Sequence, residues 1–176
     1  MNKRAYFAGG CFWCTEAIFL KINGVDNVSP IYVGGETENP TYEEVCTGLT
    51  GHAEGVEIQY NSRVIDYRSL VLLFFSTHDP TTLNRQGNDI GSQYRSAIFF
   101  KSNYEKKIIR SVIAELQIKK IYDKPIVTEI SSMTNFYLAE LIHQNFYENN
   151  LSHPYCKAII SPKIKKLMEQ NQKLLK

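Results

Sequence analysis

The stretch Gly9-Gly10-Cys11-Phe12-Trp13-Cys14 constrains the fold of this chain more than any other feature. It follows an apolar run, Ala5–Ala8, so a buried strand is expected to end at two glycines and to turn directly into a helix. Backbone N–H groups at a helix start favour negative charge on the first side chain. They stabilise the thiolate of a cysteine there, and the thiolate is the nucleophilic form. The pattern therefore predicts a reactive sulfur at a strand-to-helix turn, beside the only tryptophan of the chain.

Length and charge narrow the class of protein. With 176 residues, the chain is expected to form a single domain, residues 1–176. Its 20 basic and 18 acidic residues leave a net charge of +2, too small an excess for a typical binder of nucleic acid or of an anionic membrane. The first apolar run stops at Gly9, too early for a signal-peptide core or a membrane span. We therefore expect a cytoplasmic protein with four reduced cysteines, whose C-x-x-C pair serves redox chemistry or metal binding.

Strand and helix patterns alternate along the sequence. Strands are expected at residues 3–8, Val25–Val33, Glu54–Tyr60 (alternating, hence half-buried), Tyr94–Phe100 and Ile126–Ile130. Helices are expected at Cys11–Ile22, Pro40–Val45 with Asn39 as N-cap, Asp66–Thr77, after the capping pair Ser102 and Glu105, at Ala139–Tyr147, and from Ser161 with Ile164, Leu167 and Met168 on one face. Residues 78–93 form a polar loop.

This order of elements favours an α+β fold over a doubly wound sheet, because the strands are few and several connections are long. We expect a mixed sheet with helices packed on it, as a two-layer, ferredoxin-like α/β sandwich. A long irregular C-terminal region is expected to follow.

Five sequence blocks carry the resemblance to a known family. They are Gly10-Cys11-Phe12-Trp13, Asn39-Pro40-Thr41-Tyr42-Glu43-Glu44-Val45-Cys46, Thr50-Gly51-His52-Ala53-Glu54, His78-Asp79-Pro80-Thr81 and Arg85-Gln86-Gly87-Asn88-Asp89-Ile90-Gly91-Ser92-Gln93-Tyr94-Arg95-Ser96. In this order and spacing, from about Ala8 to Lys165, the chain closely resembles the peptide methionine sulfoxide reductases of the A type.

The resemblance implies an enzyme, a peptide-methionine (S)-S-oxide reductase that repairs oxidised proteins. Such an enzyme reduces methionine S-sulfoxide, free or in proteins, through a cysteine sulfenic acid and then an intramolecular disulfide that thioredoxin recycles. It implies no bound cofactor and no metal, and we expect a monomer whose partners are thioredoxin and oxidised proteins.

Each site residue matches a family position. Cys11 matches the nucleophile and Glu54 the acid that protonates the sulfoxide oxygen, a task that requires its carboxyl to keep a proton near neutral pH. Matches to the rest of the substrate site are Tyr42 and Tyr94 as oxygen donors, Asp89 as an oxygen holder through water, and Phe12 and Trp13 as walls of the methyl pocket. Without the family blocks, Glu54 reads as a surface residue at a strand start and Asp89 as a turn residue.

Two cysteines compete to resolve the sulfenic acid. Cys14 lies one helical turn from Cys11, and a disulfide between them requires that turn to tighten. Cys156, in the segment Ser152–Cys156, resembles the tail cysteine of many family members, and we expect that segment to be mobile. We favour Cys14 as first resolver, with Cys156 as rival or second relay. Cys46 is expected to be buried and inert.

Two departures and two rival functions accompany the resemblance. The chain has Ile31-Tyr32 where the family commonly has glycine before its tyrosine. It has Leu141-Ile142 where an acid and a phenol commonly precede His143, which we interpret as a structural histidine.

The rival functions are a general thiol–disulfide oxidoreductase and a zinc module built on Cys11, Cys14, Cys46 and a histidine. Cys46 lacks the nearby second ligand that structural zinc sites use.

Overall fold

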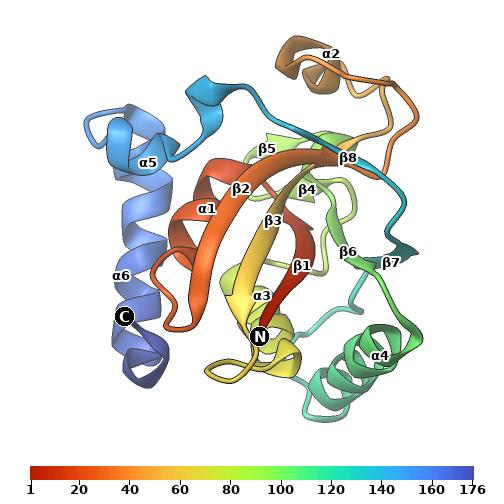
Figure 1. The fold of residues 1–176 in the computed structure, drawn as a ribbon, viewed down its shortest axis with the longest axis vertical. Coiled ribbons are helices and arrows are strands. Elements are labelled where there is room, and N and C mark those ends of the chain that lie inside the picture. The colour runs from red at the N-terminus through yellow and green to blue at the C-terminus, as the bar shows by residue number, and fades with distance from the viewer.

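The computed structural model describes residues 1–176 and contains a curled, mixed sheet of six strands (Figure 1). The strands are β1 (Asn2–Gly9), β2 (Val25–Val33), β3 (Ala53–Asn61), β6 (Ser96–Phe100), β7 (Glu129–Ser132) and β8 (Phe136–Leu138). Their order is β7-β6-β1-β3-β2-β8, and only the β6–β7 pair is parallel. The α+β fold class is thereby confirmed. The ferredoxin-like detail is not confirmed, since β7 and β8 extend the sheet at both edges.

Six α-helices accompany the sheet: α1 (Phe12–Phe19), α2 (Tyr42–Cys46), α3 (Tyr67–Thr77), α4 (Asn103–Ile118), α5 (Phe146–Asn149) and α6 (Ser161–Gln170). Helices α1 and α3 pack on one face, where Phe7 of β1 meets Phe19 and Phe74 at ring-centroid distances of 5.7 and 4.9 Å. All three side chains are buried, and each such burial contributes about 1.5–3 kcal/mol. This contact fixes the position of α1, which carries the two neighbouring cysteines.

Strand β3 is buried on both faces, so the prediction of a half-buried strand is wrong. Val56 and Ile58 belong to the large core under the helices. Ala53 belongs to a smaller cluster on the other face, against which Met133 and Phe136 pack. The sequence alternation predicts one solvent-exposed face, but Met133 and Phe136, just before and at the start of β8, cover that face.

Helix α2 begins two residues later than predicted. Asn39 has a positive φ of 45° and does not cap the helix. Thr41 is the N-cap instead, and it forms a reciprocal capping box with Glu44. The polar loop at residues 78–93 also contains more structure than expected, namely a hairpin of β4 (Arg85–Gln86) and β5 (Asp89–Ile90). A 3-10 turn over Ser92–Tyr94 then precedes β6, so Tyr94 lies outside the strand predicted to begin with it.

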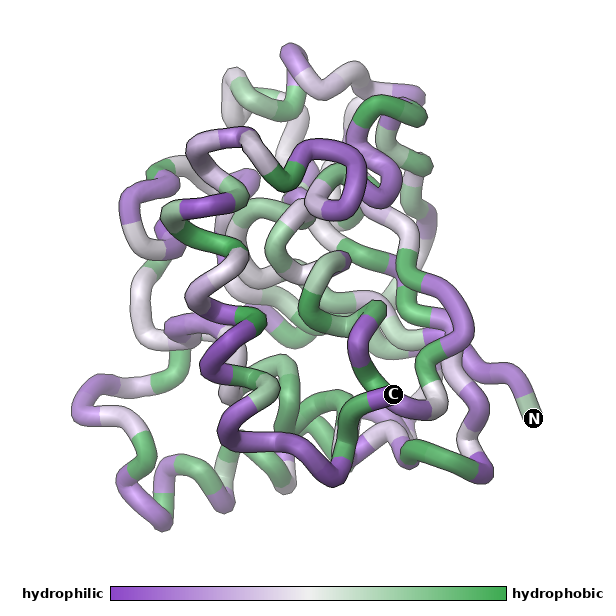
Figure 2. The backbone as a smooth tube through the Cα atoms, turned by 90° about the vertical axis from the view of Figure 1, so that its left-hand side faces the viewer, coloured by the Kyte–Doolittle hydropathy of each residue, from purple (hydrophilic) through white to green (hydrophobic).

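The helix predicted at Ala139–Tyr147 is absent. The segment forms a 3-10 turn (Leu141–His143), and Asn145 adopts a left-handed conformation with φ 54° before the short helix α5. In contrast, α6 is amphipathic as predicted, with Ile164 and Leu167 buried, although Met168 is half exposed. Figure 2, viewed from the side of α6, shows this alternation of hydrophilic and hydrophobic residues along the helix. No helix is both long and apolar enough to span a bilayer.

Candidate active site

Cys11 lies at the N-cap of α1, as predicted. Strand β1 ends at Gly9, and Gly10 turns the chain with a φ of +90°. A Cβ on Gly10 would approach the Gln86 side chain to 2.7 Å, so glycine is required there by conformation and by space. The Cys11 side chain is buried, and Glu54, at the start of β3, is among the groups that act on it.

The electrostatic environment of Cys11 differs from the predicted one. Burial raises the pKa of the Cys11 thiol well above its ordinary value, and Glu54 raises it further once its carboxyl has lost its proton. The backbone N–H of Trp13 lowers this pKa, which is the predicted effect of the helix start, but the effect is the smaller one. The resting sulfur is therefore a thiol, and the expectation of a stabilised resting thiolate is corrected.

Glu54 is the buried acid beside Cys11. It is the second residue of β3, is 1% exposed, and its Oε2 accepts the backbone N–H of Phe12 at 3.1 Å. Its Oε1 is buried without a hydrogen-bond partner. Burial raises the pKa of this carboxyl to about 8, against the opposing effect of the Phe12 N–H. At neutral pH the carboxyl keeps its proton, so the reading of Glu54 as a surface residue is excluded.

Tyr42 and Tyr94 bring two neutral phenols to the same place. Tyr42 is the first residue of α2, and Tyr94 ends the 3-10 turn that precedes β6. Both side chains are half-buried, and burial followed by the charge of Glu54 raises the pKa of each phenol. Both therefore act as uncharged hydrogen-bond donors in the neighbourhood of Glu54.

Asp89 approaches the site from the β4–β5 hairpin. Its charge raises the pKa of Cys11, Glu54 and Tyr94, which places it among them. Its Oδ2 accepts the phenol O–H of Tyr155 at 2.7 Å. Asp89 thus connects the site to the segment that carries Cys156.

Phe12 and Trp13 differ in exposure. Phe12 is fully buried among Tyr32, Tyr42 and His143, at centroid distances of 5.4–6.4 Å. Trp13 is partly exposed and stacks on Phe146 at 3.7 Å with an interplanar angle of 7°. Its indole N–H donates to Nδ1 of His143 at 3.1 Å. Of the two, Trp13 presents the more accessible aromatic surface beside Cys11.

Two carboxylates that the sequence interpretation missed hold this arrangement together. Glu140 accepts the backbone N–H of Tyr42 at 2.8 Å and the phenol of Tyr32 at 2.6 Å. Glu16 is buried in α1 and accepts the backbone N–H groups of Asn145 and Phe146 at 2.7 and 3.3 Å. Burial raises the pKa of Glu16 to about 7. The only signal for Glu16 was an acid on an otherwise apolar helix.

His143 is buried and packed, as expected of a structural histidine, whereas Tyr155 has a place at the site that the sequence interpretation missed. His143 is buried, and its ring contacts those of Phe12, Trp13 and Tyr42. Tyr155 packs edge-on against Trp13 at 5.9 Å, and the charge of Cys11 contributes to its raised pKa. The signal for Tyr155 was its place directly before Cys156.

The four cysteines are free; Cys14 is among the groups that raise the pKa of Cys11, and Cys156 among those that raise the pKa of Cys14. Cys14 is buried, and its N–H donates to the Cys11 carbonyl at 3.1 Å, an i to i+3 bond that tightens the first turn. Burial raises the pKa of Cys14, Lys163 lowers it, and Cys156 is also among the groups that act on it. Cys156 is fully buried at the start of a helical turn, Cys156–Ile160, that packs on α1 and continues into α6.

The prediction that Cys46 is buried is wrong. This residue is exposed at the last position of α2, because the helix is too short to bury it. Although the residue is exposed, partial burial of its thiol raises its pKa. No three His, Cys, Asp or Glu side chains lie together as a set of metal ligands.

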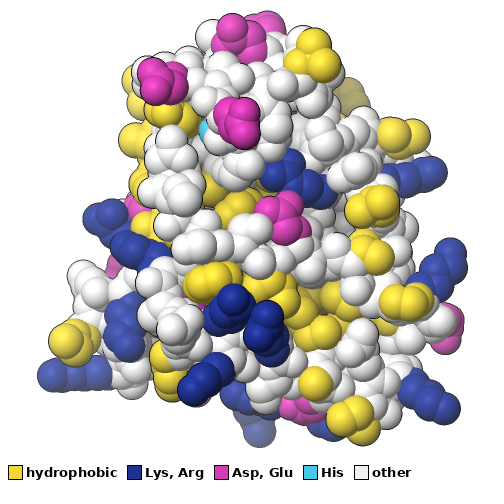
Figure 3. Space-filling view, turned by 90° about the vertical axis from the view of Figure 1, so that its right-hand side faces the viewer, with side chains coloured by type: hydrophobic (Ala, Val, Ile, Leu, Met, Phe, Trp, Pro, Cys, Tyr) yellow, Lys and Arg dark blue, Asp and Glu magenta, His cyan; other side chains and the backbone are white.

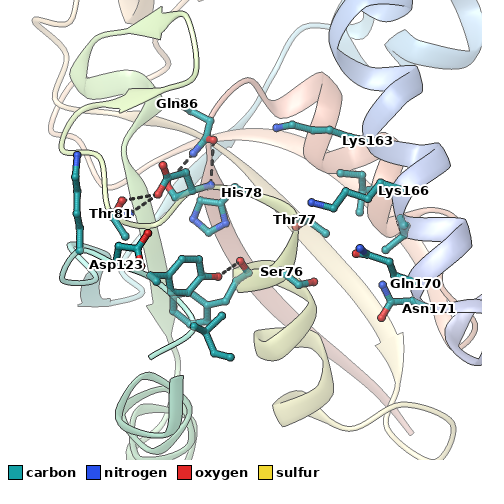
Figure 4. A pocket seen from close by; sticks show the side chains of 17 residues that line it. Ser76, Thr77, His78, Thr81, Gln86, Asp123, Lys163, Lys166, Gln170 and Asn171 are labelled. Atoms are coloured by element: carbon teal, nitrogen blue, oxygen red, sulfur yellow. Dashed lines mark hydrogen bonds between the residues drawn. The ribbon is translucent and has the colours of Figure 1, made fainter. Parts of the chain in front are cut away.

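A separate cavity of about 540 Å³ lies between the end of α3, α6 and residues 121–124. Figure 4 shows Lys163 and Lys166 extending into it from α6, across from His78 and Gln86. None of the predicted site residues lines this cavity, so we place the reaction at the Cys11 turn.

Comparisons with known proteins identify relatives of this chain. The chain matches the family described as peptide methionine sulfoxide reductase over residues 3–175. It is 53% identical over 169 residues to the peptide methionine sulfoxide reductase MsrA of Sulfolobus acidocaldarius, covering 94% of this chain and 93% of the relative. Mxr1 from Saccharomyces cerevisiae in reduced form has a TM-score of 0.82 and 37% identity, covering 88% of this chain and 89% of that one. Mxr1 in complex with Trx2 has a TM-score of 0.58 and 28% identity, covering 82% and 84%.

Proposed function

This chain belongs to the peptide methionine sulfoxide reductase family, and on that premise we propose that it reduces the S epimer of methionine sulfoxide with Cys11 as the nucleophile. The observation that carries the proposal is the pairing of Cys11 with Glu54. A reactive sulfur lies beside a buried carboxyl that keeps its proton and has one oxygen free of partners. A sulfoxide oxygen is a poor leaving group, and this carboxyl can protonate it.

Cys11 and Glu54 together supply the proton that the first step needs. The Cys11 sulfur attacks the sulfoxide sulfur, Glu54 gives its proton to the sulfoxide oxygen, and the proton released by Cys11 restores Glu54. The attack forms an S–S bond, and the protonated oxygen then passes from the methionine sulfur to the Cys11 sulfur as the S–O and S–S bonds break, so that methionine leaves and Cys11 becomes a sulfenic acid. Methionine sulfur gains two electrons and cysteine sulfur loses two.

Stereochemistry follows from the groups around Cys11. With the oxygen held by Tyr42 and Tyr94, and by Asp89 through water, and the methyl group against Phe12 and Trp13, a chiral sulfur presents one face to Cys11. Turnover of the two epimers of an N-acetylated methionine sulfoxide, measured separately with a dithiol reductant, tests the function. Only the S epimer is expected to react, and equal turnover of both epimers would refute this geometry.

We further propose a relay of three cysteines for recycling. Cys14 condenses with the Cys11 sulfenic acid, releasing water, and Cys156 then attacks Cys14 to free Cys11. The tightened first turn supports the first exchange, and the presence of Cys156 among the groups acting on Cys14 supports the second. Because Cys156 is part of a buried helical turn and not of a mobile tail, its exchange requires that turn to shift.

Peptide mapping of the oxidised enzyme tests the relay. After one turnover, Cys156→Ser should carry a bridge between Cys11 and Cys14 that a small dithiol reduces and thioredoxin reduces poorly. Cys14→Ser should release one equivalent of methionine and then accumulate the sulfenic acid. A direct bridge between Cys11 and Cys156 in the wild type, with Cys14 free, would overturn the relay.

Thioredoxin is the proposed external reductant, since a structural relative, Mxr1, has been solved in complex with Trx2. The resulting enzyme needs no bound cofactor. We propose that it acts on oxidised proteins and free methionine sulfoxide as a monomeric single-domain protein of the cytoplasm.

A further inference from the structure

Three large apolar side chains lie exposed beside the proposed site. Leu138 ends β8, and Leu141 and Ile142 occupy the 3-10 turn that follows; they are 65%, 90% and 72% exposed. The next residue, His143, is buried against Phe12, Trp13 and Tyr42. We call Leu138, Leu141 and Ile142 the apolar ledge.

The hydrogen bonds of the segment hold the ledge in place. Glu140, in the middle of it, binds the Tyr42 N–H and the Tyr32 phenol, while the Gln144 amide donates to the carbonyls of Pro30 and Ala139. With these polar groups turned toward the protein, the apolar side chains stay outside. Contiguous exposed apolar side chains can mark an interaction site.

A second surface, around α2, is acidic. Glu36, Glu38, Glu43 and Glu44 are exposed around α2, and residues 22–62 contain no lysine or arginine. Figure 3 shows acidic side chains gathered at the top of the molecule, over α2, with no basic side chain among them. We call these four residues the acidic flank. Tyr42 lies in α2 together with Glu43 and Glu44, so the acidic flank adjoins the proposed site.

We propose that the ledge and the flank bind the residues on either side of methionine sulfoxide in an unfolded polypeptide. This inference rests on the proposed reaction at Cys11, because a polypeptide whose sulfoxide reaches Cys11 must leave the site over its rim. Apolar residues would bury the ledge, and basic residues would complement the flank. The enzyme then favours sulfoxides with apolar and basic neighbours and disfavours those with acidic neighbours.

Peptides with one central methionine sulfoxide test the inference. One has leucine and lysine neighbours, one has serine neighbours and one has glutamate neighbours, and N-acetyl methionine sulfoxide serves as the reference without neighbours. We expect kcat/KM to be roughly tenfold or more higher for the leucine–lysine peptide than for the glutamate peptide. Equal values for all three peptides would overturn the inference.

Variants assign the preference to the two surfaces. Leu141→Ser combined with Ile142→Ser should lower kcat/KM for the leucine–lysine peptide relative to the reference substrate. Ile118→Ser is the matched control, because Ile118 is 82% exposed at the end of α4, on the side of the molecule away from α2 (Figure 1). Glu36→Gln combined with Glu38→Gln should weaken the preference for lysine and its dependence on salt.

Failure of the inference can be told apart from failure of the proposed function. If the function were wrong, the wild type would not reduce even the reference substrate. If only the inference were wrong, the reference would be reduced, and the Leu141→Ser, Ile142→Ser variant would keep the wild-type peptide preference.

Discussion

Replacing Cys11 with serine is expected to abolish sulfoxide reduction. The serine hydroxyl is hardly ionised at neutral pH and is a poor nucleophile toward sulfur, whereas the thiol can lose its proton as it attacks. The single-turnover rate of methionine release, measured by mass spectrometry, should fall by roughly a thousandfold or more.

Cys46→Ser provides the matched control, because it makes the same chemical change at an exposed cysteine that the proposed mechanism does not use. It should retain most of the wild-type rate. A loss of less than about tenfold in Cys11→Ser would show that another group attacks the sulfoxide, since general acid catalysis alone is typically worth more than that.

Replacing Glu54 with glutamine should slow the first chemical step by roughly a hundredfold or more. Glutamine can still accept the Phe12 N–H through its amide oxygen, so the fold is expected to persist. It cannot give a proton to the sulfoxide oxygen.

The pH profile separates a chemical role of Glu54 from a structural one. The pKa of Glu54 is raised to about 8, so the carboxyl is protonated below that pH and loses its proton above it. The wild-type single-turnover rate should therefore fall as pH rises through about 8, and Glu54→Gln should lack that fall. Unchanged kinetics in the variant would leave Tyr42 or Tyr94 as the proton source.

The sequence predicted the catalytic turn well because the signals there are local. Two glycines, a C-x-x-C pair and an apolar strand lie within ten residues, and the structure places Cys11 at the predicted helix start. The resemblance to the family also predicted that Glu54, Tyr42, Tyr94 and Asp89 share one site. The local signals gave the wrong protonation state of Cys11, because burial comes from elements that lie far away in the sequence.

The C-terminal third was harder to predict because its conformation depends on distant partners. Gln144 and Glu140 look like helix formers, yet their side chains bind Pro30, Tyr32 and Tyr42. Cys156 looked like part of a loose tail, but the helical turn that holds it is built against α1. The prediction for Cys46 was wrong in the opposite sense. Its apolar setting in the sequence predicts burial, but the fold leaves it exposed.

The buried bonds from Glu16 to Asn145 and Phe146 have a consequence for biosynthesis. Cys11 is translated within the first dozen residues. His143, which binds Trp13, and Phe146, which binds Glu16, are translated some 130 positions later. Contacts of such long sequence separation close late in folding. A nascent chain on the ribosome therefore carries the Cys11 sulfur before the residues that complete its site have been translated. Until the last third emerges, Cys11 is as open to stray oxidants as any exposed thiol.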